Sequence, residues 1–109
     1  MLFRSQRGRP TAVFAANDLS ALAVIEVAGE LGLRVPQDLS VVGFDDVPEA
    51  SRVHPALTTV AQPMRRLGAV AAEFVAALLS GETRDELHVT LPTRLVVRGT
   101  TAPPAEIAR

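Results

Sequence analysis

The sequence predicts an α/β fold with a parallel sheet, and three observations support this prediction. Residues 12–16 (AVFAA) and 40–44 (SVVGF) are short apolar runs between polar or turn-forming residues, which is typical of buried strands. Between them, residues 18–31 carry apolar side chains at helical spacing, and this order forms a parallel βαβ unit. The 109 residues, 48% of them hydrophobic, suffice for one domain. Because residues 40–44 are apolar on both faces, helices are expected on both sides of that strand.

The helix predicted over residues 18–31 has signals at both ends. Asp18 is the expected N-cap, because its carboxylate can accept hydrogen bonds from free N–H groups of the first turn. Gly32 can adopt the left-handed conformation that ends a helix, and Leu33 can fold back as the accompanying apolar contact. Pro36 then prevents continuation of the helix.

The rest of the chain carries the same kinds of pattern. Pro63 suits the first position of a long amphipathic helix, and Gly81 ends it. No regular structure is expected from Thr101 onward, because the segment lacks periodicity and contains adjacent prolines. The further elements predicted are a helical turn over residues 49–52, strands over 57–61, 87–91 and 95–97, and the long helix over 63–80.

The composition excludes several kinds of site. The chain has no Cys, which excludes disulfides, iron–sulfur clusters, thiolate zinc sites and a cysteine nucleophile. All 11 basic residues are Arg, so a P-loop lysine and a Schiff-base lysine are also excluded. The formal net charge is −1 and the arginines are dispersed, which argues against nucleic-acid binding by this chain alone. We expect no cofactor and no metal site.

The compartment is predicted from two further features. No apolar run approaches the roughly 20 residues of a membrane helix, and the first residues lack the apolar stretch of a signal peptide. The absence of Cys also agrees with a reducing compartment. We therefore expect a cytoplasmic protein without membrane contact.

Polar side chains follow three of the predicted strands. Asn17 follows the first strand, Asp45 and Asp46 the second, and Gln62 the third. Ligands of open α/β sheets bind at the carboxyl ends of the strands. Two amides and a carboxylate at one such edge would suit a sugar or another neutral polyol. Of the two adjacent acids, one is expected to face the ligand and the other solvent; the alternative is a purely structural Asx turn that ends the strand.

Catalysis is a weaker hypothesis for the same residues. Asp18, Asp45 and Asp46 resemble an acidic magnesium site for phosphoryl transfer, but the lysine that such chemistry uses is absent. His54 and His88 are isolated in the sequence and receive no catalytic role. We therefore expect that the chain is not an enzyme.

Three spaced motifs give the chain a specific resemblance. FAAND at residues 14–18, VPQDLSVVGFDD at 35–46 and LTTV at 57–60 occur together in this order. With these motifs the chain resembles the LacI/GalR family of transcription regulators, from about residue 9 to 101. The resemblance implies part of a type I periplasmic-binding-protein fold, in which two Rossmann-like lobes joined by three crossover strands enclose a small effector.

The resemblance also implies roles for individual residues. Asn17 and Asp45 match positions that contact the effector, and Gln62 lies at a crossover beside the cleft. Phe44 matches an aromatic or apolar position at the end of its strand and is included in the expected effector site. The region near the subunit contact of a homodimer comprises Ala50, Ser51, Arg52, Val53 and His54.

The family pattern divides the chain into a lead-in at residues 1–10, the C-terminal part of the effector-binding domain at 11–101 and a flexible tail at 102–109. Within it, residues 11–62 belong mostly to the second lobe, 63–80 to a helix of the first lobe and 87–99 to closing strands. The family's helix-turn-helix, its hinge helix, the sheet of its first lobe and the first half of its second lobe have no counterpart here, so a C-terminal fragment is expected. The face of the long helix formed by Met64, Leu67, Phe74 and Leu78 should then be uncovered.

The expected function is the effector-sensing portion of a LacI-type regulator. It would bind a small sugar-like ligand and thereby modulate DNA binding by a helix-turn-helix outside this chain. The alternative is the sugar-binding protein of a transporter, which shares the fold.

Overall fold

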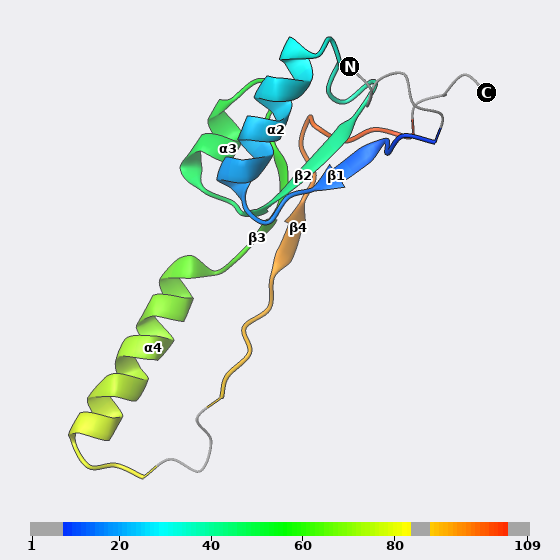
Figure 1. Ribbon diagram of the computed structural model, residues 1–109. Coiled ribbons are helices and arrows are strands. Elements are labelled where there is room, and N and C mark those ends of the chain that lie inside the picture. Colours follow the sequence, from blue (N-terminus) through cyan, green and yellow to red (C-terminus); the bar gives the residue numbers. More distant parts are fainter. Residues whose placement is uncertain (1–7, 84–87, 105–109) are drawn as a thin grey trace.

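A computed structural model of the chain describes residues 8–83 and 88–104 (Figure 1). The four strands form one sheet in the order β1-β2-β3-β4, in which β1, β2 and β3 are parallel and β4 is antiparallel to β3. The predicted α/β fold with a parallel sheet is confirmed. The elements are β1 (Ala12–Phe14), α2 (Asp18–Glu30), β2 (Ser40–Asp45), α3 (Pro48–Arg52), β3 (Thr58–Ala61), α4 (Met64–Leu79) and β4 (Arg94–Val96).

The C-terminal end of α2 forms as its sequence predicts. Gly32 has a φ of 75°, and its N–H donates to the carbonyl of Gly29 at 3.0 Å. The N–H of Leu33 donates to the carbonyl of Ala28 at 2.8 Å, and the Leu33 side chain is buried. This pair of hydrogen bonds is the Schellman motif, which satisfies carbonyls that the helix leaves free. The motif returns the chain toward β2.

The hydrophobic core lies between β2 and the helices α2 and α3, which are on one side of the strands in Figure 1. Val41 faces this core and is fully buried, whereas Val42 and Phe44 on the opposite face are only half-buried. The prediction of helices on both sides of this strand is therefore wrong within the described residues, which supply no helix to that second face. The buried apolar residues of the core are Ala15, Ala21, Ala28, Leu33, Leu39, Val41, Ala50 and Leu57.

The segment after β4 is attached to the parallel strands. Thr100 is fully buried; its carbonyl accepts from the N–H of Val41 at 2.9 Å, and its Oγ1 donates to the Val41 carbonyl at 2.6 Å. The N–H of Thr58 donates to Thr100 Oγ1 at 2.9 Å. Ala102 is held by the Ser40 hydroxyl. The segment has no helix or strand, as expected, but the tail predicted from residue 102 is anchored at its first residue; residues 105–109 lie outside the described part.

The first predicted strand after the long helix, over residues 87–91, does not form. Residues 88–91 have no regular structure, and Leu87 lies outside the described residues. Alternating apolar side chains are not sufficient for a strand, because its backbone also needs a neighbouring strand with free N–H and C=O groups. In the described sheet β4 is an edge strand, and none of the four strands pairs with residues 88–91.

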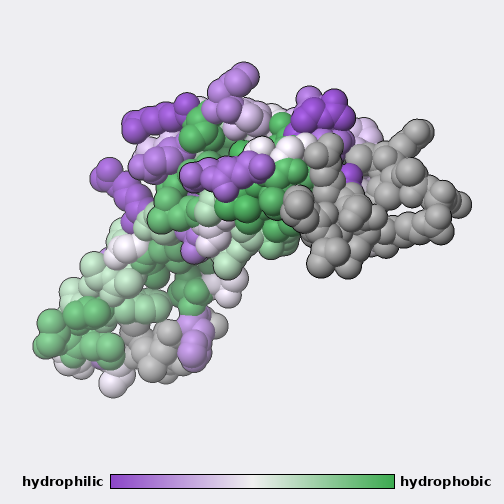
Figure 2. Space-filling view, turned by 45° about the horizontal axis from the view of Figure 1, so that its top comes forward, coloured by the Kyte–Doolittle hydropathy of each residue, from purple (hydrophilic) through white to green (hydrophobic). Residues whose placement is uncertain are grey.

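Helix α4 extends away from the sheet, and the chain returns beside it to β4 (Figure 1). The radius of gyration is 19.0 Å, compared with about 13 Å for a compact chain of this length. Hydrophobic residues gather on the projecting part in Figure 2. In α4, Met64, Leu78 and Leu79 are 55%, 55% and 83% exposed. The expected uncovered face is confirmed at Met64, Leu67 and Leu78, whereas Phe74 is half-buried.

None of the helices within the described ranges is long and apolar enough to cross a membrane.

Substitution of Gly43 tests how closely α2 packs on β2. A Cβ at this position would overlap Asp18 Oδ1 and would lie 2.9 Å from Leu57 Cδ2, so Gly43→Ala must displace buried neighbours. We expect it to lower the free energy of unfolding by about 1–3 kcal/mol in chemical denaturation.

Gly29→Ala is the matched control for this substitution. Gly29 lies in α2 with no atom within 4 Å of the added Cβ. Its substitution should stabilise the helix by about 0.5–1 kcal/mol. Equal effects of the two substitutions would contradict the close contact at Gly43.

Candidate functional site

The carboxyl ends of β1, β2 and β3 lie side by side, and two of the predicted site residues meet there. Asp45 ends β2 and is in register with Ala61, the last residue of β3. Gln62 Nε2 donates to Asp45 Oδ1 at 2.7 Å, and the Gln62 N–H donates to the Asp45 carbonyl at 3.2 Å. The carboxylate and one amide are therefore adjacent at this edge, both half-buried and partly accessible.

Asn17 follows β1 at the same edge and has a structural role. It is the N-cap of α2, and its Oδ1 accepts from the N–H of Ser20 at 2.8 Å. The expectation that Asp18 caps this helix is wrong, because Asp18 is its first helical residue and its side chain turns inward. With Oδ1 occupied, the Asn17 side chain retains its amide nitrogen as a donor toward the edge.

The Asp18 carboxylate is fully buried and connects three elements. Its Oδ1 accepts from Thr59 Oγ1 of β3 at 2.5 Å, and its Oδ2 accepts from the Val47 N–H at 2.8 Å. Its position in the first turn of α2 also places the negative charge near the positive end of the helix dipole. Asp18 therefore fixes the edge from inside and does not offer its carboxylate to a ligand.

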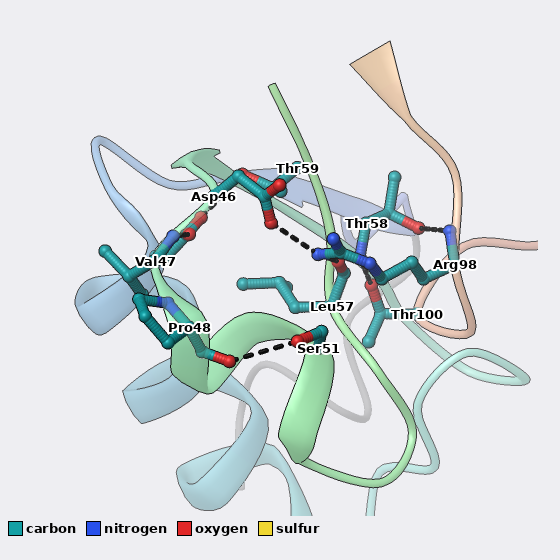
Figure 3. A network of polar contacts seen from close by, with 10 residues as sticks. Asp46, Val47, Pro48, Ser51, Leu57, Thr58, Thr59, Arg98 and Thr100 are labelled. Carbon is teal, nitrogen blue, oxygen red and sulfur yellow. Dashed lines mark hydrogen bonds and ion pairs between the residues drawn. The ribbon is translucent and has the colours of Figure 1, made fainter. Parts of the chain in front are cut away.

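The turn after β2 has an unusual backbone. Asp45 and Asp46 have φ angles of 128° and 65°, a region that residues with a side chain rarely adopt. Asp46 Oδ1 forms an ion pair with Arg98 Nη1 at 2.8 Å, in which both side chains are largely buried (Figure 3). The expectation that one of the two acids faces solvent is wrong, since both are half-buried and Asp46 is paired with Arg98. The ion pair leaves Asp45 as the carboxylate available at this edge.

An aromatic hollow lies beside these polar groups. Phe44 and Phe14 line it together with Ala15 and Ala16, and its volume is about 340 Å³. Phe14 is 68% exposed and was not among the predicted site residues. Strand alternation was the signal for it, because Val13 packs against the core and Phe14 must therefore point to the opposite face. The edge combines polar groups with aromatic surface.

The three acids of the hypothetical magnesium site do not converge. Asp18 is bonded to Thr59 and Val47, and Asp46 is paired with Arg98. Within residues 8–83 and 88–104, no group of three or more His, Cys, Asp or Glu side chains could hold a metal ion. The geometry therefore gives no support to metal-assisted phosphoryl transfer. His54 and His88 are exposed.

The structure distinguishes the residues predicted at a dimer contact. Ala50 is fully buried in the core of the chain, so its side chain cannot reach a partner subunit. Ser51, Arg52 and His54 are exposed and Val53 is half-buried, which leaves these four as candidates.

One carboxyl group has a clearly shifted pKa and lies away from this edge. Hydrogen bonds from the Arg34 guanidinium and then from its N–H lower the pKa of Asp38 from 3.8 to about 2. Both residues precede β2, at the opposite end of the strand from Asp45. Their ion pair stabilises the loop between α2 and β2 and does not contribute to the candidate site.

The sequence as a whole matches a known family of domains. The profile of the periplasmic binding protein-like domain matches residues 1–101. The chain belongs to this family.

Its relatives are transcription regulators, which confirms the resemblance to LacI-type regulators. The HTH-type transcriptional repressor PurR of Edwardsiella ictaluri (strain 93-146) is 44% identical over 98 residues, 90% of this chain and 29% of the repressor. A LacI family transcriptional regulator from Mycobacterium smegmatis has a TM-score of 0.85 and 43% identity, over 95% of this chain and 39% of its own. A dimeric lac repressor has a TM-score of 0.79 and 41% identity, over 87% and 35%. The chain spans less than a third of the curated relative.

Two substitutions of Asn17 distinguish its role as the N-cap of α2 from a contact with a ligand. Asn17→Ala removes the acceptor for the Ser20 N–H and should destabilise the chain by about 1 kcal/mol. Asn17→Ser keeps an acceptor at the N-cap and should leave the free energy of unfolding nearly unchanged, while it removes the amide donor. Chemical denaturation of both variants checks this expectation, and equal losses in the two would contradict the capping role.

Proposed function

We propose that the chain is the effector-sensing part of a LacI-type transcription regulator and that its effector is a sugar or a sugar derivative. The contact between Asp45 and Gln62 at the carboxyl edge of a parallel sheet carries this proposal. The relatives of this chain are transcriptional regulators, which also supports the proposal.

The chemistry of the edge favours a ligand with several hydroxyl groups. Asp45 is a strong acceptor for hydroxyl donors, whereas Gln62 and Asn17 supply amide N–H groups for ligand oxygens. The aromatic rings of Phe14 and Phe44 provide an apolar surface of the kind that covers the less polar face of a ring. Solved structures of similar regulators include a cellobiose complex and one with bound ribose, which supports this ligand class.

The proposed mechanism couples the effector to DNA through the rest of a larger protein. An effector that binds one arrangement of the two lobes more tightly shifts the equilibrium toward it. That shift would change the geometry of a homodimer and hence operator affinity. The proposed dimer contact on this chain comprises the exposed residues Ser51, Arg52 and His54 and the half-buried Val53. DNA would be bound by a domain outside the chain, in the cytoplasm, and no catalytic step is involved.

The division into lobes is part of the same proposal. Residues 11–62 would lie mostly in the second lobe, and 63–80 would form a helix of the first lobe. The exposed apolar side chains of α4, such as Val75 and Leu79, support this assignment, because they need a covering surface that the described residues do not supply.

The effector site is tested by adding ribose and cellobiose to the isotopically labelled chain and following its NMR spectrum. We expect chemical-shift changes centred on Asn17, Asp45 and Gln62 for at least one sugar. Asp45→Asn should weaken that binding by about tenfold or more, since hydrogen bonds to a charged acceptor are the stronger ones.

Asp38→Asn is the matched control, because it makes the same chemical change at an acid outside this edge. Sugar binding that survives Asp45→Asn unchanged would contradict the site. Failure of both sugars to bind the chimera described below, in which the rest of the regulator is present, would contradict their assignment as effectors.

Regulatory coupling is tested in a chimera of the dimeric lac repressor in which residues 9–101 replace the matching segment. Operator affinity is measured without ligand and with ribose, cellobiose or the anti-inducer ONPF, which is named for a lac repressor complex. We expect at least one ligand to change operator affinity by about tenfold. Asp45→Asn should abolish that response without changing operator affinity in the absence of ligand.

A chimera that binds a ligand while its operator affinity stays constant would favour the alternative, a sugar-binding protein of a transporter.

A further inference from the structure

Arg98 reaches from the segment after β4 to the turn that follows β2. Its Nη1 lies 2.8 Å from Asp46 Oδ1 and also donates to the carbonyl of Leu57 at 3.0 Å (Figure 3). The two side chains of the ion pair are only 19% and 25% exposed. An ion pair that is largely removed from water and shares a hydrogen-bonded carbonyl has a fixed geometry, unlike a mobile pair on the surface.

The turn at Asp45 and Asp46 requires such a restraint. Both residues have positive φ angles, and neither is a glycine. A backbone in this region returns to a more favourable conformation unless surrounding contacts hold it. The direction of the Asp45 side chain depends on its backbone angles, so relaxation of the turn would move the carboxylate.

Three consecutive residues of this turn are each held by a different part of the chain. Asp45 is bonded to Gln62 after β3, and the Val47 N–H is bonded to Asp18 in α2. Asp46 lies between these anchors, and Arg98 is its partner. Of the three contacts, the one with Arg98 holds the residue that directly follows the candidate effector carboxylate.

Arg98 is itself well fixed. Its N–H donates to Thr58 Oγ1 at 2.9 Å, and the next residue, Gly99, donates its N–H to the Ala56 carbonyl at 2.8 Å. A Cβ at Gly99 would lie 3.1 Å from Pro55 Cβ, so the backbone of this segment packs closely against the loop before β3. The guanidinium therefore extends from a rigid support.

We propose that Arg98 is a positioning residue of the effector site, which acts through Asp46 to hold the Asp45 carboxylate beside Gln62. The importance of Asp45 for an effector rests on the proposed function, whereas the restraint itself does not. Arg98 follows β4 by two residues, so the direction of the Asp45 carboxylate depends on the position of this strand. A displacement of β4 would thereby change the site without any contact between β4 and the ligand.

Hydrogen exchange followed by mass spectrometry tests the restraint on the full chain without any ligand. The reporters are the backbone amides of Gln62, which donates to the Asp45 carbonyl, and of Val47, which donates to Asp18 Oδ2. Asp45 and Val47 flank Asp46 in the sequence, and the amides of α2 are the internal reference. Arg98→Met should accelerate exchange in peptides that contain Val47 or Gln62 by about tenfold, since it leaves Asp46 without its charged partner. Exchange in α2 should change much less.

The background variant Asp46→Asn shows whether Arg98 acts through Asp46. Asn tolerates a positive φ better than most residues and cannot form the ion pair. Arg98→Met should therefore accelerate local exchange much less in the Asp46→Asn chain than in the unsubstituted chain. Arg34→Met is the matched control, because it removes the other arginine–aspartate ion pair and should leave the reporters unchanged.

If Arg98→Met also accelerates hydrogen exchange in α2, Arg98→Lys is the milder variant. It keeps the positive charge but cannot reproduce the planar guanidinium, and we expect local exchange between that of the unsubstituted and Met chains. Equal acceleration over the whole chain in both variants would show a general stabilising role and overturn the proposal. The same effect of Arg98→Met with and without Asp46→Asn, or unchanged reporters, would also overturn it. Because no sugar is present, failure of sugar binding bears on the proposed function alone.

Discussion

The buried carboxylate of Asp18 is the interaction on which the arrangement of the carboxyl edge depends. It joins the first turn of α2 to Thr59 of β3 and to the N–H of Val47. A buried carboxylate without partners would be strongly destabilising, so the surrounding chain must supply these donors. Gly43 lies directly beneath it, and any side chain there would displace the carboxylate. This one group therefore determines how closely α2 approaches the sheet and where the turn after β2 begins.

The strained turn after β2 follows from the same arrangement. With Val47 held by Asp18 and the end of β2 held by β3, the two residues between them must reverse the chain within a short span. Asp45 and Asp46 do so with positive φ angles, which cost about 1–3 kcal/mol each at such positions. Strain of this kind persists only where neighbouring contacts maintain it, and it is commonly found at functional sites. The location of the turn at the ligand-binding edge of a parallel sheet is consistent with that tendency.

Local patterns in the sequence predicted most of the helices and strands, but not the contacts between residues that are distant in the sequence. The Gly32 and Leu33 signals gave the end of α2 correctly, because a helix terminus depends on a few adjacent residues. Asp18 turns inward because it is bonded to Thr59 and Val47, which are distant from it in the sequence. Asn17 therefore caps the helix, and capping propensity alone could not distinguish Asn17 from Asp18. Asp46 and its partner Arg98 are separated by about half the length of the chain, and no spacing rule connects them. The absent strand at residues 88–91 was predicted from alternation, which contains no information on a pairing partner.

The described residues give the candidate site one wall, and the fold indicates where a second one belongs. Asp45, Gln62 and the aromatic hollow occupy an edge that is open on the side away from the sheet. A small polar ligand on such an open surface exchanges water for few protein contacts and gains little free energy. Beyond this edge, the chain leaves β3 directly after Gln62, forms α4, and returns to β4. Helix α4 leaves Val75 and Leu79 exposed. A folded unit that covered these side chains would be held next to the edge by the two segments that connect α4 to β3 and β4. The covering of α4 and the closing of the effector site would then be two consequences of one contact.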